Sequence, residues 1–301
     1  MYQLCDKLVI GISSRALFCL EIENRVFDGE GIQAYRSYQA KRDDVVLEPG
    51  TAFGLVRNLL RINEGLDKPL VEVVVISRNS PDVAIRVFRS IEYHNLNITR
   101  AAFTSGRRLP ALLKAFNVQL FLSRHAPDVS LAVSNGIAAA RLYDPPDGPT
   151  PEGDEIHFAF DGDAVLFSEA SEKIYQRDGL SAFAEHERQN ARVPLEPGPF
   201  APFLRALALL QSRDQELPVS IRTSLVTARC SPSHERVLRT FREWGVTVDQ
   251  ALFLGGVDKG SVLAAIRPDI FFDDQDVHLA SAANLVPSGQ VPWPIGPDPA
   301  P

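Results

Sequence analysis

An internal repeat constrains the fold of this chain more than any other feature of its sequence. Leu47–Gly50 and Leu195–Gly198 both read Leu-Glu-Pro-Gly and lie 148 residues apart. Arg86–Arg89 and Arg236–Arg239 share an Arg-Val-apolar-Arg pattern at a spacing of 150 residues. Three further pairs of segments match in the same order at nearly the same spacing: 16–18 with 165–167, 73–77 with 223–227, and 119–122 with 269–272. This regularity predicts a tandem duplication, although two α/β halves of generic likeness would give part of it.

Within each half, short apolar runs alternate with segments of helical character. In the second half the runs that suit buried parallel strands are 156–160, 221–226, 251–254 and 269–272. The segments that suit helices are 200–211, 232–244 and 261–267. Strand–helix–strand order predicts an α/β fold with a Rossmann-like parallel sheet, right-handed crossovers and ligands at the carboxyl ends of the strands.

Proline-rich stretches suggest where the chain divides. Residues 144–153 are dense in proline and glycine, which suit neither a helix nor a central strand. The last fifteen residues contain six prolines. We therefore expect one half at 1–143, a linker at 144–155, a second half at 156–286, and an extended or disordered tail at 287–301.

Charge and cysteine content exclude several classes of protein. The net charge of −7 provides no basic field for a nucleic-acid polymer. No apolar run approaches the roughly 18–20 residues of a membrane span, and the first residues do not resemble a secretory leader. The three widely spaced cysteines form no zinc pattern. We interpret them as buried free thiols of a cytoplasmic protein.

Polar residues follow four strands of the predicted second half. They are Asp161 and Asp163 after the first, Thr227 after the second, Lys259 after the third, and the pair Asp273-Asp274 after the fourth. Each alone has an ordinary explanation as a turn, a helix cap or a solvated charge. Together, at one edge of a parallel sheet, they predict an anion site built around a hard metal ion.

This set resembles the haloacid dehalogenase-like phosphatase superfamily, whose pattern is DxDx[TV], then Thr or Ser, then Lys, then an acidic pair. Residues 158–168, 225–229 and 270–275 further resemble the cytosolic 5′-nucleotidase I family, as do 12–18 and 135–140 in the first half. The similarity runs from about residue 7 to about residue 290. It implies a fold of the haloacid dehalogenase type, with a small helical cap inserted at about 168–219 of the second half.

The resemblance also implies a mechanism. Asp161 would attack the phosphorus atom, and Asp163 would act as general acid and then as general base. Thr227 and Lys259 would stabilise the transferring phosphoryl group. Mg²⁺ would be held by Asp161, Asp163, Asp273 and Asp274, with Asp163 contributing its carbonyl.

The substrate implied is a nucleoside 5′-monophosphate. Candidates for contacting it are Arg229 and, in the cap, Phe183, His186, Arg188 and Phe200, of which the aromatic residues could equally be core. The rival interpretations are a phosphatase for a sugar phosphate or another small monoester, and a nucleotide-binding regulator without catalysis. The sequence is compatible with a homo-oligomer and does not fix its size.

The first half lacks the carboxylates and the lysine at the matching positions. Ile12 and Ser14 lie opposite Asp161 and Asp163, give or take one residue, and Leu109 lies opposite Lys259. We therefore expect a catalytically dead copy, which either supports the active half or binds the substrate nucleoside or a nucleotide effector. The candidate contacts are Ser13, Ser14, Arg15, Ser77, Arg78, Asn79, Arg107 and Arg108.

Overall fold

The computed structural model describes residues 3–81, 84–146 and 153–292. The strands in these ranges are β1 (Leu8–Ile12), β2 (Val71–Ser77), β3 (Arg100–Phe103), β4 (Leu120–Ser123), β5 (Ala138–Leu142), β6 (Glu155–Phe160), β7 (Ser220–Thr227), β8 (Gln250–Phe253), β9 (Ile270–Asp273) and β10 (Ser288–Gln290). The helices are α1 (Ser14–Leu17), α2 (Glu21–Ala40), α3 (Phe53–Arg61), α4 (Ala84–Tyr93), α5 (Pro110–Ala115), α6 (Ala126–Ser134), α7 (Ala170–Gln189), α8 (Ala201–Gln211), α9 (His234–Trp244), α10 (Lys259–Ile266) and α11 (Asp276–Ala282), with a 3₁₀ turn at Asp214–Glu216.

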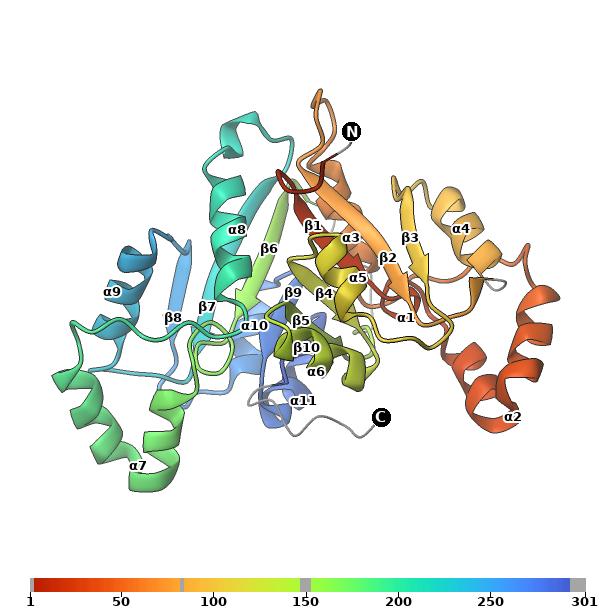
Figure 1. Ribbon diagram of the computed structural model, residues 1–301. Helices are drawn as coiled ribbons and strands as arrows, with labels where there is room; N and C mark the ends of the chain where they lie inside the picture. The colour runs from red at the N-terminus through yellow and green to blue at the C-terminus, as the bar shows by residue number, and fades with distance from the viewer. Residues whose placement is uncertain (1–2, 82–83, 147–152, 293–301) are drawn as a thin grey trace.

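One sheet runs through the described part of the chain, in the order β3-β2-β1-β4-β5-β10-β9-β6-β7-β8. The order is symmetric about its centre, since β1 to β5 occupy the places that β6 to β10 occupy on the other side. Neighbouring strands within each half are parallel, whereas β5 and β10 pair antiparallel at the join. Figure 1 shows the two halves side by side, with the helices of each packed around its own strands. The α/β fold with a mostly parallel sheet is confirmed.

The two faces of the sheet are covered differently. On one face a single cluster of buried apolar side chains includes Leu59 of α3 and Leu204 of α8, and so extends across both halves. On the other face each half has its own cluster, one around Phe121 and one around Phe271. Strands buried on both faces explain the continuous apolar runs in the sequence. Asn58 adds a polar contact between the halves, since its Nδ2 donates to Asp269 Oδ1 at 2.9 Å.

Each half carries a helical insertion after its first strand. Both α2 and α7 bend at a glycine in the left-handed region, Gly31 with φ 80° and Gly179 with φ 81°, a conformation that glycine adopts without steric cost. The two insertions extend away from opposite ends of the sheet (Figure 1). The expectation of a cap in the second half alone therefore differs from the structure. The expected range of 168–219 is also too long, because α8 packs on β7 as part of the helix layer.

The repeated Leu-Glu-Pro-Gly motif has a steric reason. A Cβ on Gly198 would lie 2.4 Å from the carbonyl oxygen of Phe167, and one on Gly50 would lie 2.8 Å from that of Ala16. The preceding prolines form matching bridges, Pro49 with Phe18 and Pro197 with Phe167. The motif is therefore where the chain crosses the loop that follows the first strand of each half.

Several expected boundaries change. Glu155, which we placed in the linker, begins β6, and Ser288–Gln290, which we placed in the tail, form β10 at the centre of the sheet. Residues 147–152 of the expected linker and residues 293–301 of the expected tail lie outside the described residues. The expectation of buried thiols is wrong, because Cys5, Cys19 and Cys230 are exposed. Among the described residues, every helix is too short or too polar to cross a bilayer.

Candidate active site

The carboxyl ends of three adjacent strands bring the sequence candidates together. Asp161 follows β6, Thr227 ends β7, and Asp273 ends β9. The order β9-β6-β7 puts these ends beside one another, and the Asp161 N–H donates to the Phe272 carbonyl at 2.8 Å. Lys259 reaches the same point from the first residue of α10. Strand order thus brings together Asp161 and Asp273, which are 112 positions apart in the sequence.

Lys259 is the centre of the cluster. Its Nζ donates to Asp161 Oδ1 at 2.7 Å and to Asp273 Oδ2 at 2.6 Å. Only 2% of the Lys259 side chain is exposed. Burial by itself would lower the pKa of this ammonium, but the two carboxylates outweigh burial and raise the pKa. Lys259 is therefore a permanent cation between two acids.

A third carboxylate lies close to this pair without a cation of its own. Oxygen atoms of Asp161, Asp273 and Asp274 lie within 4.8 Å of one another. Asp274 Oδ1 is buried and has no hydrogen-bond partner among the described residues. Burial, followed by the charges of Asp161 and Asp273, raises the pKa of Asp274 to about 8. Burial also raises the pKa of Asp161 to about 7, with Asp273 adding to the effect and Lys259 opposing it.

This donor set fits a divalent cation. Three carboxylates with a single ammonium leave uncompensated negative charge in a buried place, which is costly. Hard oxygen ligands are those that Mg²⁺ prefers. The unpartnered Asp274 oxygen is the atom that a bound cation would satisfy.

Thr227 and Gly162 lie beside one another at the end of β7, next to Asp161. Thr227 is 1% exposed, and its Oγ1 accepts from the Arg229 N–H at 3.3 Å. A Cβ at Gly162 would approach this Oγ1 to 3.1 Å. The glycine between the two aspartates therefore lets the loop pass close to Thr227. Ala164, two positions further on, has φ 60°, a region that residues other than glycine rarely adopt.

Asp163 does not join the carboxylate cluster. Its two oxygens accept from Arg229, Oδ2 from Nε at 2.7 Å and Oδ1 from Nη2 at 2.6 Å. The expected contribution of its carbonyl to a metal site stays a prediction. Arg229 is 5% exposed and also donates to Glu187 at 2.6 Å, so it lies in an internal network.

The three cap residues suggested for substrate contact have different surroundings. Phe183 is buried, packs edge-on against Tyr175, and lies 5.4 Å from the Arg229 guanidinium. His186 is one-third exposed and lies 3.4 Å from Glu187. Arg188 pairs with Glu185 at the surface. Phe200, the fourth candidate, is fully buried in the core.

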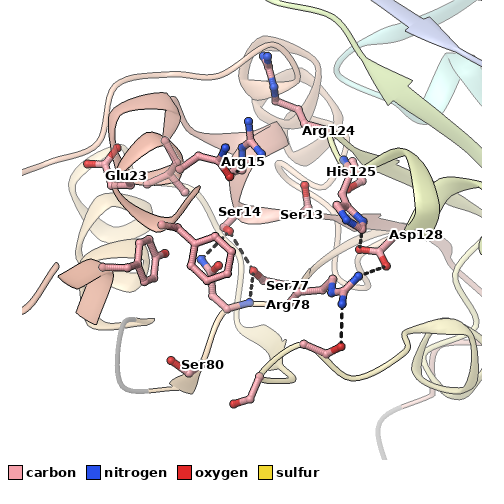
Figure 2. A pocket seen from close by; sticks show the side chains of 18 of the residues that line it. Ser13, Ser14, Arg15, Glu23, Ser77, Arg78, Ser80, Arg124, His125 and Asp128 are labelled. Carbon is pink, nitrogen blue, oxygen red and sulfur yellow. Dashed lines mark hydrogen bonds and ion pairs between the residues drawn. The ribbon is translucent and has the colours of Figure 1, made fainter. Parts of the chain in front are cut away.

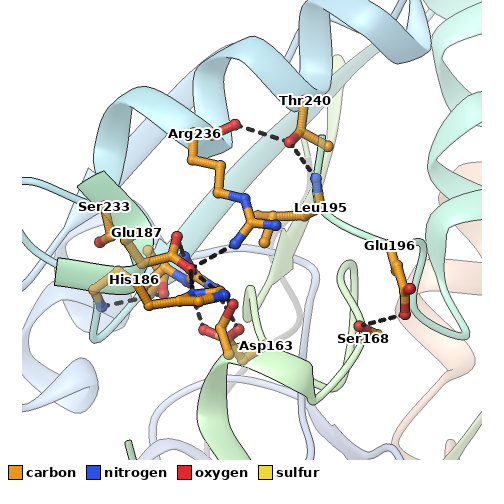
Figure 3. A network of polar contacts seen from close by, with 12 residues as sticks. Asp163, Ser168, His186, Glu187, Leu195, Glu196, Ser233, Arg236 and Thr240 are labelled. Atoms are coloured by element: carbon orange, nitrogen blue, oxygen red, sulfur yellow. Dashed lines mark hydrogen bonds and ion pairs between the residues drawn. The ribbon is translucent and has the colours of Figure 1, made fainter. Parts of the chain in front are cut away.

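Two residues of the site escaped the sequence analysis. Glu187 is fully buried and binds Arg229, Arg236 and Ser171 (Figure 3). His278 Nδ1 lies 3.2 Å from Asp273 Oδ2. Glu187 had a detectable signal, since the repeat aligns this charged residue with the uncharged Gln39. His278 matches no motif, so no sequence signal pointed to it.

The first half has a pocket at the equivalent strand ends. Ser13 holds the place of Asp161, because its N–H donates to the Leu122 carbonyl as that of Asp161 donates to Phe272; our match of Ile12 was one residue off. A cavity of about 550 Å³ opens there (Figure 2). Its lining includes six of the eight residues proposed for binding: Ser13, Ser14, Arg15, Ser77, Arg78 and Asn79. Arg107 and Arg108 do not belong to it.

The sequence is similar to that of known proteins. The family model described as 5′-nucleotidase matches residues 1–297. The chain is 36% identical over 291 residues to human cytosolic 5′-nucleotidase 1B, an alignment that covers 93% of this chain. It covers 48% of the human protein, so the chain spans about half the length of this relative. The chain belongs to the 5′-nucleotidase family.

Proposed function

We propose that the chain is a Mg²⁺-dependent 5′-nucleotidase that hydrolyses nucleoside 5′-monophosphates through a phosphorylated Asp161. The observation that carries the proposal is the pair of short contacts from Lys259 to Asp161 and Asp273. Family membership supports a phosphoric monoester as substrate. The name of the human relative supports a cytosolic location.

The reaction has two displacements at phosphorus. An Asp161 oxygen forms a bond to phosphorus while the bond to the nucleoside 5′-oxygen breaks, and Asp163 gives that oxygen a proton. A water molecule then attacks the phosphorylated Asp161, and Asp163 takes the proton from the water. Inorganic phosphate leaves, and Asp161 returns to its starting form. Lys259 and the Thr227 hydroxyl stabilise the charge on the phosphoryl oxygens.

Asp161, Asp273 and Asp274 are the side chains that would hold Mg²⁺, whose charge offsets that of the phosphate dianion. Without a cation, these carboxylates would repel an anionic substrate. The proposal therefore requires that activity depend on a divalent ion.

A substrate panel tests the proposal. Phosphate release is measured with AMP, IMP, UMP, GMP, deoxynucleotides and glucose 6-phosphate, with Mg²⁺ and with EDTA. We expect release from nucleotides that EDTA abolishes and added Mg²⁺ restores. Faster turnover of glucose 6-phosphate than of every nucleotide would favour the sugar-phosphate alternative. Binding without turnover would favour a regulator.

The pocket of the first half favours a second role, the binding of a phosphorylated effector without chemistry. Ser80 lines the cavity, is 4% exposed, and its Oγ has no hydrogen-bond partner among the described residues. Arg78 borders the same cavity, and the aromatic rings of Phe27 and Tyr35 line it too. Hydroxyl groups and a cation suit a phosphate, and the rings suit a base.

Calorimetric titration of ADP tests this role in an Asp161→Asn background, which prevents turnover. We expect Arg15→Ala and Arg78→Ala to weaken ADP binding, and Arg107→Ala, outside the cavity, to leave it unchanged. Equal affinity in all three variants would leave the first half with a structural role alone.

A further inference from the structure

We infer that Arg229 and Glu187 are positioning residues that fix the Asp163 carboxylate from the cap helix α7, a role that rests on the proposed function. The structure joins these residues in one chain of contacts, from Glu187 on α7 to Arg229 after β7 and then to Asp163 after β6. The side chains of Arg229 and Glu187 are 2% and 0% exposed.

The contact between Arg229 and Asp163 fixes orientation as well as place. Two parallel hydrogen bonds of 2.7 and 2.6 Å hold both carboxylate oxygens in the plane of the guanidinium. A lysine would supply the same charge without this planar fork. The arrangement turns Asp163 away from Lys259 and the carboxylate cluster, which leaves the two acids of the DGD loop in separate surroundings.

Glu187 in turn fixes Arg229. Its Oε2 accepts from Arg229 Nη1 at 2.6 Å, and its Oε1 accepts from Arg236 and Ser171 at 2.8 and 2.9 Å (Figure 3). Arg236 is anchored to the backbone through the Val193 carbonyl at 2.8 Å. Burial alone would raise the pKa of Glu187, but its partners, Arg229 first, lower it, so the charge persists.

The corresponding network of the first half shows which of these contacts occur without the carboxylate cluster. There Arg86 donates to the Val45 carbonyl at 2.7 Å and to Gln39 at 3.1 Å, as Arg236 does to Val193 and Glu187, and it also pairs with Glu23 of α2 at 2.5 Å. The place of Arg229 is taken by Asn79, which donates to Ser14 instead. Both halves thus join an arginine of the helix layer to an acid of the helical insertion, whereas among the described residues the further link to an acid in the loop after the first strand occurs only in the second half.

The test compares two substrates in Glu187→Gln and Arg229→Lys. The nucleoside leaving group of AMP needs a proton from Asp163, whereas p-nitrophenolate does not. With AMP, we expect kcat to fall about 100-fold with KM within threefold of wild type. With p-nitrophenyl phosphate, we expect a burst of one equivalent of p-nitrophenol followed by slow turnover, because only the second step still needs Asp163.

Arg86→Lys, which disturbs the corresponding network of the first half, controls for a structural role and should leave kcat unchanged. Equal losses on both substrates without a burst, or a rise in KM alone, would overturn the inference. Arg229→Lys keeps the buried charge and so provides a folded variant if Glu187→Gln fails to fold. A wild-type protein inactive on both substrates would instead refute the proposed function, on which the inference rests.

Discussion

The two halves of the sheet differ far more at their strand ends than in their framework. Both have five parallel strands in the same order, a glycine-kinked cap helix, and a Leu-Glu-Pro-Gly crossing. The polar groups of the second half are replaced at the corresponding positions of the first: Asp161 corresponds to Ser13, Lys259 to Leu109, and Asp273 to Ser123. A framework that buries apolar strands therefore persists when its chemistry is removed, because none of these polar side chains is needed to hold the sheet together.

The loops that follow the first strands of the two halves also differ in length, by one residue. The loops begin after Ile12 and Phe160, which are 148 residues apart, and they end at the matching residues Phe18 and Phe167, which are 149 residues apart. The shorter loop forms the helical turn α1. The longer one contains Ala164 with φ 60°, a conformation that costs roughly 1–3 kcal/mol and is found at functional sites.

The largest expected effect in this comparison is that of the nucleophile. Asp161→Asn is nearly isosteric but removes covalent catalysis, so we expect phosphate release from AMP to fall at least about 1000-fold. Steady-state turnover with Mg²⁺ measures this, with thermal unfolding as the control for folding. Activity within tenfold of wild type would show that Asp161 is not the nucleophile.

Lys259 and Leu109 form the next pair, since they match across the repeat. Lys259→Met removes the cation between Asp161 and Asp273, and we expect turnover to fall about 100- to 1000-fold. Leu109→Met keeps the volume of a buried apolar residue and should change turnover less than twofold. Similar losses in both variants would mean that the first half contributes to turnover as much as the second.

The crossing glycines predict a difference in stability. Gly198→Ala would force a Cβ to 2.4 Å from one carbonyl oxygen and 2.5 Å from another, whereas Gly50→Ala would meet one at 2.8 Å. We expect both to lower the free energy of unfolding by about 1–3 kcal/mol or more, with Gly198→Ala the worse. Urea unfolding of the two variants measures the order, and a reversed order would contradict the steric argument.

The last expected effect is a dependence of stability on pH in the absence of metal. The pKa of Asp274 is raised to about 8, so the folded chain binds a proton there that the unfolded chain has lost above about pH 4. Stability should therefore fall as the pH rises from about 4 to 8, by up to about 1.4 kcal/mol per pH unit for one group. Thermal unfolding in EDTA measures this.

A variant and a metal ion serve as controls for this measurement. Asp274→Asn should flatten the profile, and Mg²⁺ should restore stability at pH 8. A profile in EDTA that rises over this range in the wild type would contradict the crowding of carboxylates.

The sequence predicted the part of the site that depends on strand order. Four residues, Asp161, Thr227, Lys259 and Asp273, lie at or next to the end of a recognisable strand or helix, so a parallel sheet was enough to bring them together. The sequence did not predict that the Asp163 carboxylate would accept hydrogen bonds from Arg229. That contact depends on the path of a loop and on a buried glutamate of α7, and neither is set by a local pattern.

The fold was predicted where apolar runs were long enough to define strands. The strand Ser288–Gln290 was missed because three small polar residues among prolines have no strand character of their own. Its place comes from tertiary contacts, since Gly289 lies where a Cβ would meet Ala140 at 2.9 Å. The helical insertion of the first half was not predicted, because that half lacks the carboxylate motif that precedes the insertion in the second half.

The antiparallel pairing of β5 with β10 has a consequence for the origin of the chain. A single unit ending in such a strand would present an open edge, which tends to pair with another copy. Two identical edges that pair antiparallel give a two-fold symmetric dimer. The described strands thus have the arrangement of a two-fold symmetric dimer whose two subunits are joined in one chain.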